Sequence, residues 1–118
     1  MKSCRGRGGA VDQITYENVT LVKQSIGGQG GVQTAIDIDL EYKENVLPTN
    51  ASATPTFSRI TLRKVIGSTT DTSIFIRGLP EAPIKGLSLS DICLESPTTT
   101  IETSFVRLQM ENLAVLPS

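Results

Sequence analysis

The sequence predicts an all-β fold, a parallel β-solenoid, and three observations carry this prediction. Four segments share one pattern: ITYENVTL from Ile14, ITLRKVIG from Ile60, LSLSDICL from Leu87 and LQMENLAV from Leu108. Apolar and polar residues alternate in each segment, which is typical of a strand with one buried face. No segment shows a helical period of apolar residues, so no crossover helix links the strands. Repetition of one strand pattern favours stacked coils.

The spacing of the repeats and one recurrent position support stacking. The repeats begin 46, 27 and 21 residues apart, and the two shorter intervals suit stacked strand-loop units. The fifth position of each repeat holds Asn18, Lys64, Asp91 or Asn112. Asparagine and aspartate tolerate left-handed backbone, so we expect a bend there. An antiparallel sandwich would also give short alternating strands, but matching residues at matching points of successive units favour the solenoid.

The stretches between the repeats divide into further strands and loops. AIDIDLEY at 35–42 and SIFIRG at 73–78 alternate like strands. The first long interval also contains SIGGQGGVQT at 25–34 and NVLPTNASATPT at 45–56, which have the glycine, proline and threonine content of loops. Each unit therefore supplies two or three short strands.

Composition excludes several functions. The chain has 118 residues, enough for one domain, and 11 basic against 12 acidic residues give a net charge of −1. This balance predicts binding to neither nucleic acid nor an anionic membrane. Histidine is absent, which excludes imidazole as a base or metal ligand. Cys4 and Cys93 lack metal-ligand spacing, and we expect two thiols, with Cys93 in a core strand, over a disulfide. The sequence predicts no metal and no cofactor.

The order of motifs resembles one enzyme family. MKSCRGRGGAVDQITYENVTL is similar to the segment that follows the last catalytic motif in polygalacturonases and related family 28 pectinases, and TPTFSRITLRKVIG and IRGLPEAPIKGLSLSDICLES resemble their later coils. The resemblance covers residues 1–96. It implies a right-handed parallel β-helix, of which residues 1–118 are about four C-terminal coils of a single domain truncated on its N-terminal side. The polar segment before Ile14 is too short to cap the end of a solenoid, which agrees with the expectation that further coils precede it.

The resemblance also implies a function. Family members hydrolyse α-1,4-galacturonan with inversion, which requires one carboxylic acid for the leaving oxygen and one carboxylate to activate water. Their Asn-Thr-Asp, Asp-Asp and Gly-His-Gly motifs precede the segment matched here, and this chain contains none of the three. We therefore expect no catalytic residue in this chain and no activity from it alone. The alternative is a non-catalytic β-solenoid that binds polysaccharide or is purely structural.

Two substrate-binding residues are implied by the resemblance. Lys2 matches a family lysine that binds the substrate carboxylate, and Tyr42 matches a tyrosine beside the cleaved bond. An ammonium suits an anionic sugar, and a tyrosine offers a ring face and a hydroxyl. Without the resemblance, Lys2 would be an ordinary surface charge and Tyr42 a strand-end aromatic. Arg5 and Arg7 are weaker candidates for a secondary substrate contact.

The remaining candidates have simpler explanations. Asp37, Asp39 and Glu41 share one strand face, which could be an acid pair or calcium site; a solvated face is favoured. Asn50 heads a glycosylation sequon in a loop, whereas the sequon at Asn18 falls on a predicted bend.

The expected partner is a polysaccharide, polygalacturonate or pectin, with no nucleic acid and no membrane. We expect a monomer, secreted to the cell exterior or cell wall, with any signal peptide upstream of this chain.

Overall fold

The computed structural model describes residues 1–22, 32–42 and 54–118, and this part of the chain consists of strands joined by turns. Because Val, Ile, Leu and Thr dominate the segments between turns, the chain favours extended backbone. The strands are β1 (Ala10–Leu21), β2 (Thr34–Asp39), β3 (Thr56–Ser68), β4 (Thr72–Arg77), β5 (Ile84–Ser96), β6 (Thr98–Ser104) and β7 (Val106–Pro117). The two predicted loops at 25–34 and 45–56 lie mostly outside the described residues.

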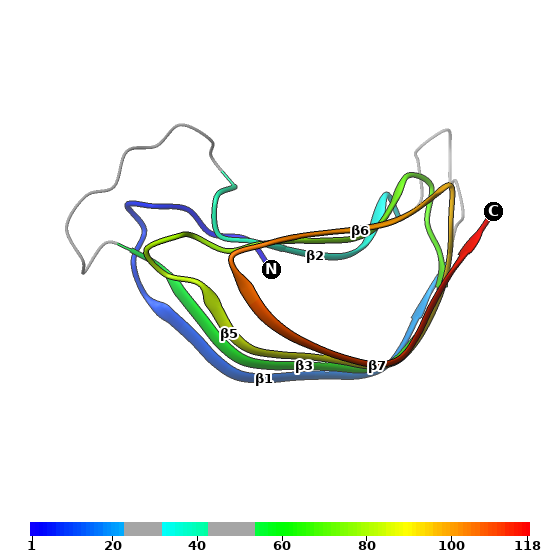
Figure 1. Ribbon diagram of the computed structural model, residues 1–118, viewed down its shortest axis with the longest axis horizontal. Coiled ribbons are helices and arrows are strands. Elements are labelled where there is room, and N and C mark those ends of the chain that lie inside the picture. Colours follow the sequence, from blue (N-terminus) through cyan, green and yellow to red (C-terminus); the bar gives the residue numbers. More distant parts are fainter. Residues whose placement is uncertain (23–31, 43–53) are drawn as a thin grey trace.

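The strands form two parallel sheets that face each other, as predicted. One sheet has the order β1-β3-β5-β7 and the other the order β2-β4-β6. The chain passes alternately from a long strand to a short one, and successive coils stack in the right-handed sense of a parallel β-helix (Figure 1). The predicted row of Ile14, Ile60, Leu87 and Leu108 is confirmed, since each residue is paired in register with the next.

The long strands bend because one residue of each adopts left-handed backbone. The predicted positions all have positive φ: Asn18 at 57°, Lys64 at 58°, Asp91 at 53° and Asn112 at 52°. These residues stack, and the Asn112 Nδ2 donates a hydrogen bond of 2.8 Å to the Asp91 Oδ1. Stacked bends make every long strand turn at the same point of its coil (Figure 1).

A second row of bends was not predicted. It comprises Gln13, Arg59 and Gly86, which all have positive φ and lie at matching points of β1, β3 and β5. Phe105 also has positive φ, but it lies in the turn before β7, ahead of the pairing of Val106 with Ile84. The last coil is shorter here, and the register of β5 and β7 shifts between Ile84 and Leu87. Strand β6 was also not singled out from the sequence. Only Gly86 among these positions carries an obvious local signal for left-handed backbone.

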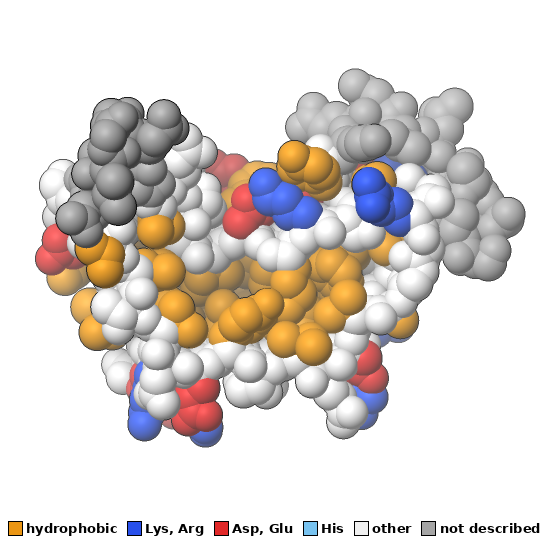
Figure 2. Space-filling model, turned by 180° about the vertical axis from the view of Figure 1, so that it is seen from behind, with side chains coloured by type: hydrophobic (Ala, Val, Ile, Leu, Met, Phe, Trp, Pro, Cys, Tyr) orange, Lys and Arg blue, Asp and Glu red, His pale blue; other side chains and the backbone are white. Residues whose placement is uncertain are grey.

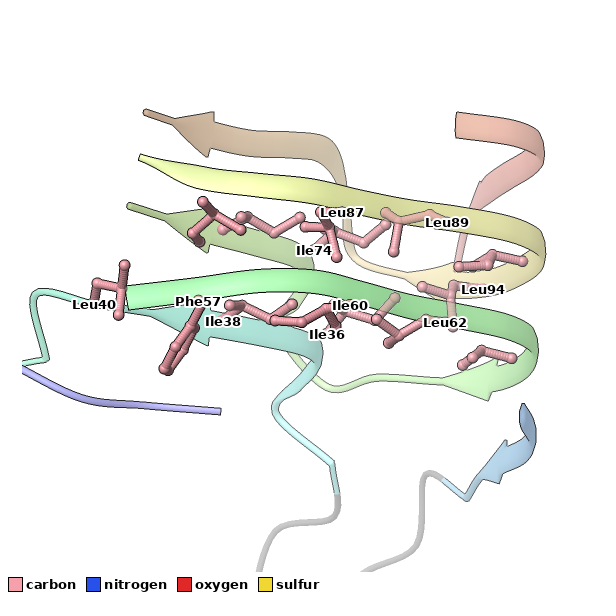
Figure 3. Packing of buried hydrophobic residues seen from close by; sticks show 14 of the residues in the cluster. Ile36, Ile38, Leu40, Phe57, Ile60, Leu62, Ile74, Leu87, Leu89 and Leu94 are labelled. Atoms are coloured by element: carbon pink, nitrogen blue, oxygen red, sulfur yellow. The ribbon is translucent and has the colours of Figure 1, made fainter. Parts of the chain in front are cut away.

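Aliphatic residues of the two sheets fill the interior. Ile60 and Leu87 from the long strands pack with Ile36 and Ile74 from the short strands, and all are buried (Figure 3). Cys93 lies on β5 as predicted, but its side chain is exposed and Cys4 is the buried thiol. The Cys93 side chain points outward because the bend at Asp91 changes which residues of the strand point inward.

Candidate functional site

The first three residues form an additional row on the short-strand sheet. The Asp39 backbone N–H donates to the Met1 carbonyl at 2.9 Å, and the Ser3 N–H donates to the Asp39 carbonyl at 2.8 Å. Lys2 and Asp39 thereby form a parallel bridge. Because neighbouring residues of an extended segment point to opposite sides, this pairing fixes Lys2 outward, on the outer face of β2.

The two residues implied to bind substrate lie side by side on that face. The Lys2 Nζ lies 4.6 Å from the centroid of the Tyr42 ring, a cation–π distance. The Tyr42 N–H donates to the Ser3 carbonyl at 3.0 Å, which ties the tyrosine to the strand of the lysine. Tyr42 is 57% exposed, so its ring is available to a ligand. A charged donor beside an exposed aromatic ring can contact both the carboxyl group and the apolar face of a sugar.

The acidic strand differs from its prediction as a solvated face. Asp39 is only 5% exposed. The Asp37 Oδ2 lies 3.4 Å from the Lys2 Nζ, while the Asp37 Oδ1 is buried and has no hydrogen-bond partner within the described residues. The Glu41 carboxylate pairs with Arg5. Cations from the neighbouring rows cover this face, which the alternation of one strand cannot reveal. The described residues contain no cluster of ligands that could hold a metal ion.

Arg77 on β4 binds the buried carboxylate. Its guanidinium donates to both oxygens of Asp39, at 2.9 and 2.8 Å, and to the Glu41 carbonyl at 2.8 Å. Such a bidentate contact fixes both side chains. The Arg77 guanidinium also lies 5.4 Å from the centroid of the Phe75 ring, two residues earlier on the same outer face. Sequence reasoning missed both residues, although the alternation of SIFIRG gives their facing.

Arg5 is held by two carboxylates. It bonds Glu81 through two nitrogens, at 2.7 and 2.8 Å, and Glu41 at 3.1 Å. The hydrogen bonds from Arg5 lower the pKa of Glu81 to about 2. The same bonds raise the pKa of Arg5. This network attaches the N-terminal segment to the turn after β4, and a substrate contact by Arg5 stays a prediction.

The remaining candidates from the sequence are Arg7, Asn50 and Asn18. Arg7 is exposed, in the turn that its N–H closes with the Cys4 carbonyl at 3.2 Å. Asn50 lies outside the described residues. Asn18 occupies the predicted bend and is exposed. Nowhere in ranges 1–22, 32–42 and 54–118 is there a helix long and apolar enough to cross a membrane.

The outer face of the short-strand sheet thus combines a lysine, two aromatic rings and several carboxylates. The sequence contains no histidine and no Asp-Asp motif. The family model described as glycosyl hydrolases family 28 matches residues 1–112. No curated protein and no solved structure gives a significant match. The parallel coils, the stacked bends and this match over nearly the whole chain show together that the chain belongs to glycosyl hydrolases family 28.

Proposed function

We propose that this chain is the C-terminal part of a polygalacturonase-type enzyme that cleaves α-1,4-galacturonan in pectin by inverting hydrolysis. The single observation that carries the proposal is the contact of Lys2 with Tyr42, at 4.6 Å, on the outer face of a family 28 β-helix. These residues come from separate coils, and a polysaccharide lying across the coils would touch both. The chain supplies part of the substrate-binding wall, and the two acids of the inverting reaction lie in preceding coils.

The uncovered interior at the β1 end supports preceding coils. Inward-facing Tyr16 stacks on buried Leu62, yet it is 43% exposed, since no strand of the described residues pairs with β1 on its other side. An apolar hollow opens at this end, as Figure 2 shows; it is lined by Met1, Tyr16, Val19, Leu21, Ile36 and Leu62, among others. A solenoid interior requires a covering layer, because exposed apolar columns and an unpaired strand edge favour association. A further long strand in parallel register with β1 would supply that layer.

The coding sequence upstream of Met1 provides the first test. The proposal expects an open frame that encodes Asn-Thr-Asp, Asp-Asp and Gly-His-Gly motifs before Lys2. A frame without them would contradict it and favour the non-catalytic solenoid. The 118-residue chain alone is expected to release no reducing ends from polygalacturonate, since it has no acid pair for the reaction. Turnover by the purified chain would refute the assignment of the chemistry to preceding coils.

The role of Lys2 is tested in the longer enzyme. Lys2→Ala is expected to lower kcat/KM on polygalacturonate by about tenfold or more, the effect of losing one charge-assisted contact of about 1.5–3 kcal/mol. The matched control is Lys85→Ala, since Lys85 is exposed on β5 in the other sheet. Equal rates for the two variants would remove Lys2 from the binding wall. We place the whole enzyme outside the cell, where pectin is found, and expect it to act as a monomer.

A further inference from the structure

The turn that carries Tyr42 decides where the exposed ring of the binding wall lies, an inference that rests on the proposed function. Strand β2 ends at Asp39, and three residues later the Tyr42 ring lies 4.6 Å from the Lys2 Nζ. Tyr42 is 57% exposed, so burial of the ring itself does little to fix it. Exposed segments with few buried contacts open easily. The place of the ring is therefore determined by the contacts of the main chain that carries it.

Asp39 connects the lysine and the tyrosine through its main chain and its side chain. Its backbone pairs with the residues on both sides of Lys2, through hydrogen bonds of 2.9 and 2.8 Å. Its Oδ1 accepts a hydrogen bond of 2.8 Å from the Glu41 N–H, two residues ahead. This is the contact of an Asx turn, and it lies directly before Tyr42. Asp39 therefore fixes the lysine through the strand and the tyrosine through the turn.

The next coil holds the same turn through Arg77 on β4. The Arg77 guanidinium donates to both oxygens of Asp39, at 2.9 and 2.8 Å, and to the Glu41 carbonyl at 2.8 Å. The Arg77 carbonyl accepts the Leu40 N–H at 2.8 Å, and Leu40 is fully buried (Figure 3). One residue thus holds three consecutive residues of the turn. The Asp39 side chain is 7% exposed, so water competes little for these bonds.

Glu41 is held at a third group by the N-terminal segment. The Arg5 Nη1 lies 3.1 Å from the Glu41 Oε1, and the Arg5 side chain is 11% exposed. The N–H, the carbonyl and the carboxylate of Glu41 are therefore all contacted. The next N–H, that of Tyr42, donates to the Ser3 carbonyl at 3.0 Å. The main chain is thus fixed on both sides of the peptide that leads into Tyr42.

We propose that Arg77 is a positioning residue for substrate binding: through Asp39 and Glu41 it holds the Tyr42 ring beside the Lys2 ammonium. Its guanidinium acts through these contacts, and its side chain is only 22% exposed. A galacturonate unit then meets the ammonium and the ring in one fixed arrangement. Such preorganisation lowers the cost of ordering the site when the ligand binds.

NMR of the 118-residue chain measures the position of the ring without any assumption about activity. The Tyr42 ring shifts the resonances of the Lys2 side-chain methylene beside it upfield, and Tyr42→Ala provides the unshifted reference. Arg77→Met is expected to remove most of this shift while the amide spectrum of β3 and β5 stays folded. Arg63→Met is the matched control on β3 and should leave the shift unchanged, since Arg63 pairs with Glu17 in the other sheet.

Arg77→Lys keeps the test decisive if Arg77→Met does not fold. Lysine retains the charge beside Asp39, but an ammonium cannot reproduce the planar, bidentate contact together with the bond to the Glu41 carbonyl. Part of the Lys2 shift should therefore be lost in Arg77→Lys. A full shift in the folded Arg77 variants would overturn the positioning role and would leave the assignment to a pectin hydrolase intact.

A double-mutant cycle in the longer enzyme separates positioning from stability. Arg77→Met is expected to lower kcat/KM on polygalacturonate about three- to tenfold, close to the loss in Tyr42→Ala. In the Tyr42→Ala background the same substitution should have less than about a twofold effect, because the ring that Arg77 positions is gone. Leu87→Ala is the control for stability: Leu87 is buried on β5, and its substitution should change kcat/KM by the same factor in both backgrounds.

Two outcomes of the cycle distinguish failure of the positioning role from failure of the proposed function. Equal losses for Arg77→Met with and without the Tyr42 ring would show a structural role alone and overturn the proposal. An unaltered kcat/KM in Tyr42→Ala would overturn the binding wall of the proposed function, and the positioning role with it.

Discussion

Replacing Arg77 by methionine is expected to destabilise the fold by about 2–4 kcal/mol, since the substitution leaves a buried acid unpaired. Methionine retains most of the apolar stem and removes only the guanidinium. Arg77 makes three hydrogen bonds to the β2 row, two to the Asp39 carboxylate and one to the Glu41 carbonyl. The variant therefore isolates the charge and its hydrogen bonds.

The magnitude follows from the burial of the two partners. The Asp39 side chain is 7% exposed and that of Arg77 is 22% exposed. Breaking a fully buried pair costs about 3–5 kcal/mol, because the remaining charge stays desolvated. Access of solvent to Arg77 lowers this range. The Glu41 N–H still donates to the Asp39 Oδ1 at 2.8 Å, which compensates part of the loss.

The assay is urea unfolding of the purified chain, followed by far-UV circular dichroism and read as the free energy of unfolding at constant slope. Arg63→Met is the control: its guanidinium lies 2.7 Å from Glu17, an equally short pair, but the side chains are 48% and 39% exposed. We expect this variant to lose less than about 1 kcal/mol. Asp39→Asn in the Arg77→Met background should recover part of the loss, because the unpaired charge is removed.

Three outcomes would refute this reasoning. A loss below about 1 kcal/mol for Arg77→Met would mean that burial does not strengthen the pair. Equal losses for the Arg77 and Arg63 variants would lead to the same conclusion. Strict additivity of the Asp39 and Arg77 substitutions would show that the two side chains are not coupled.

Three further predictions concern the interior, the turn after β4 and the packing between coils. Gly67→Ala should lower the free energy of unfolding by more than about 2 kcal/mol. The φ of Gly67, 145°, is unfavourable for a residue with a side chain, and a Cβ there would lie 2.1 Å from the Leu21 carbonyl oxygen. An unchanged melting temperature would show that β1 shifts freely. Because Arg5 holds the pKa of Glu81 at about 2, below its ordinary 4.5, the pair stabilises the fold above pH 4.5 and this contribution is lost as pH falls toward 2. In Glu81→Gln, the free energy of unfolding should therefore fall less steeply between pH 4.5 and 2 than in the unaltered chain. The same decrease in both proteins would exclude this ion pair as its cause. Leu87→Ala should cost about 2–5 kcal/mol in urea unfolding, since Leu87 is 1% exposed; a loss under 1 kcal/mol would contradict a close-packed interior.

The stacking of the coils could be predicted from the sequence because it depends on residues that repeat. Inward positions recur at the same points of each unit, so Ile60 and Leu87 could be aligned before their pairing was seen. The bends at Asn18 and Asp91 carried a local signal, since these side chains tolerate left-handed backbone. The bends at Gln13 and Arg59 carried none, because neither residue type favours that conformation, and stacking on neighbouring coils imposes it.

The environment of the candidate site depended on contacts between coils. The alternation of the strand predicted that Asp37 and Asp39 share one face. Their cationic partners lie far away in the chain: Lys2 pairs with Asp37 over 35 positions, and Arg77 pairs with Asp39 over 38. Pairing over such distances is decided by the register of parallel strands, which no single strand encodes. The predicted solvated face is for this reason a charge network.

The sequence alone determined the class of fold, the row of stacked aliphatic residues, one row of bends and the absence of histidine from this chain. These properties follow from residue identity and short-range periodicity. Tertiary structure alone decided which thiol is buried, where the second row of bends lies and which cation meets which carboxylate. The physical reason is that burial and electrostatic pairing are set by neighbours in adjacent coils, and those neighbours are remote in sequence.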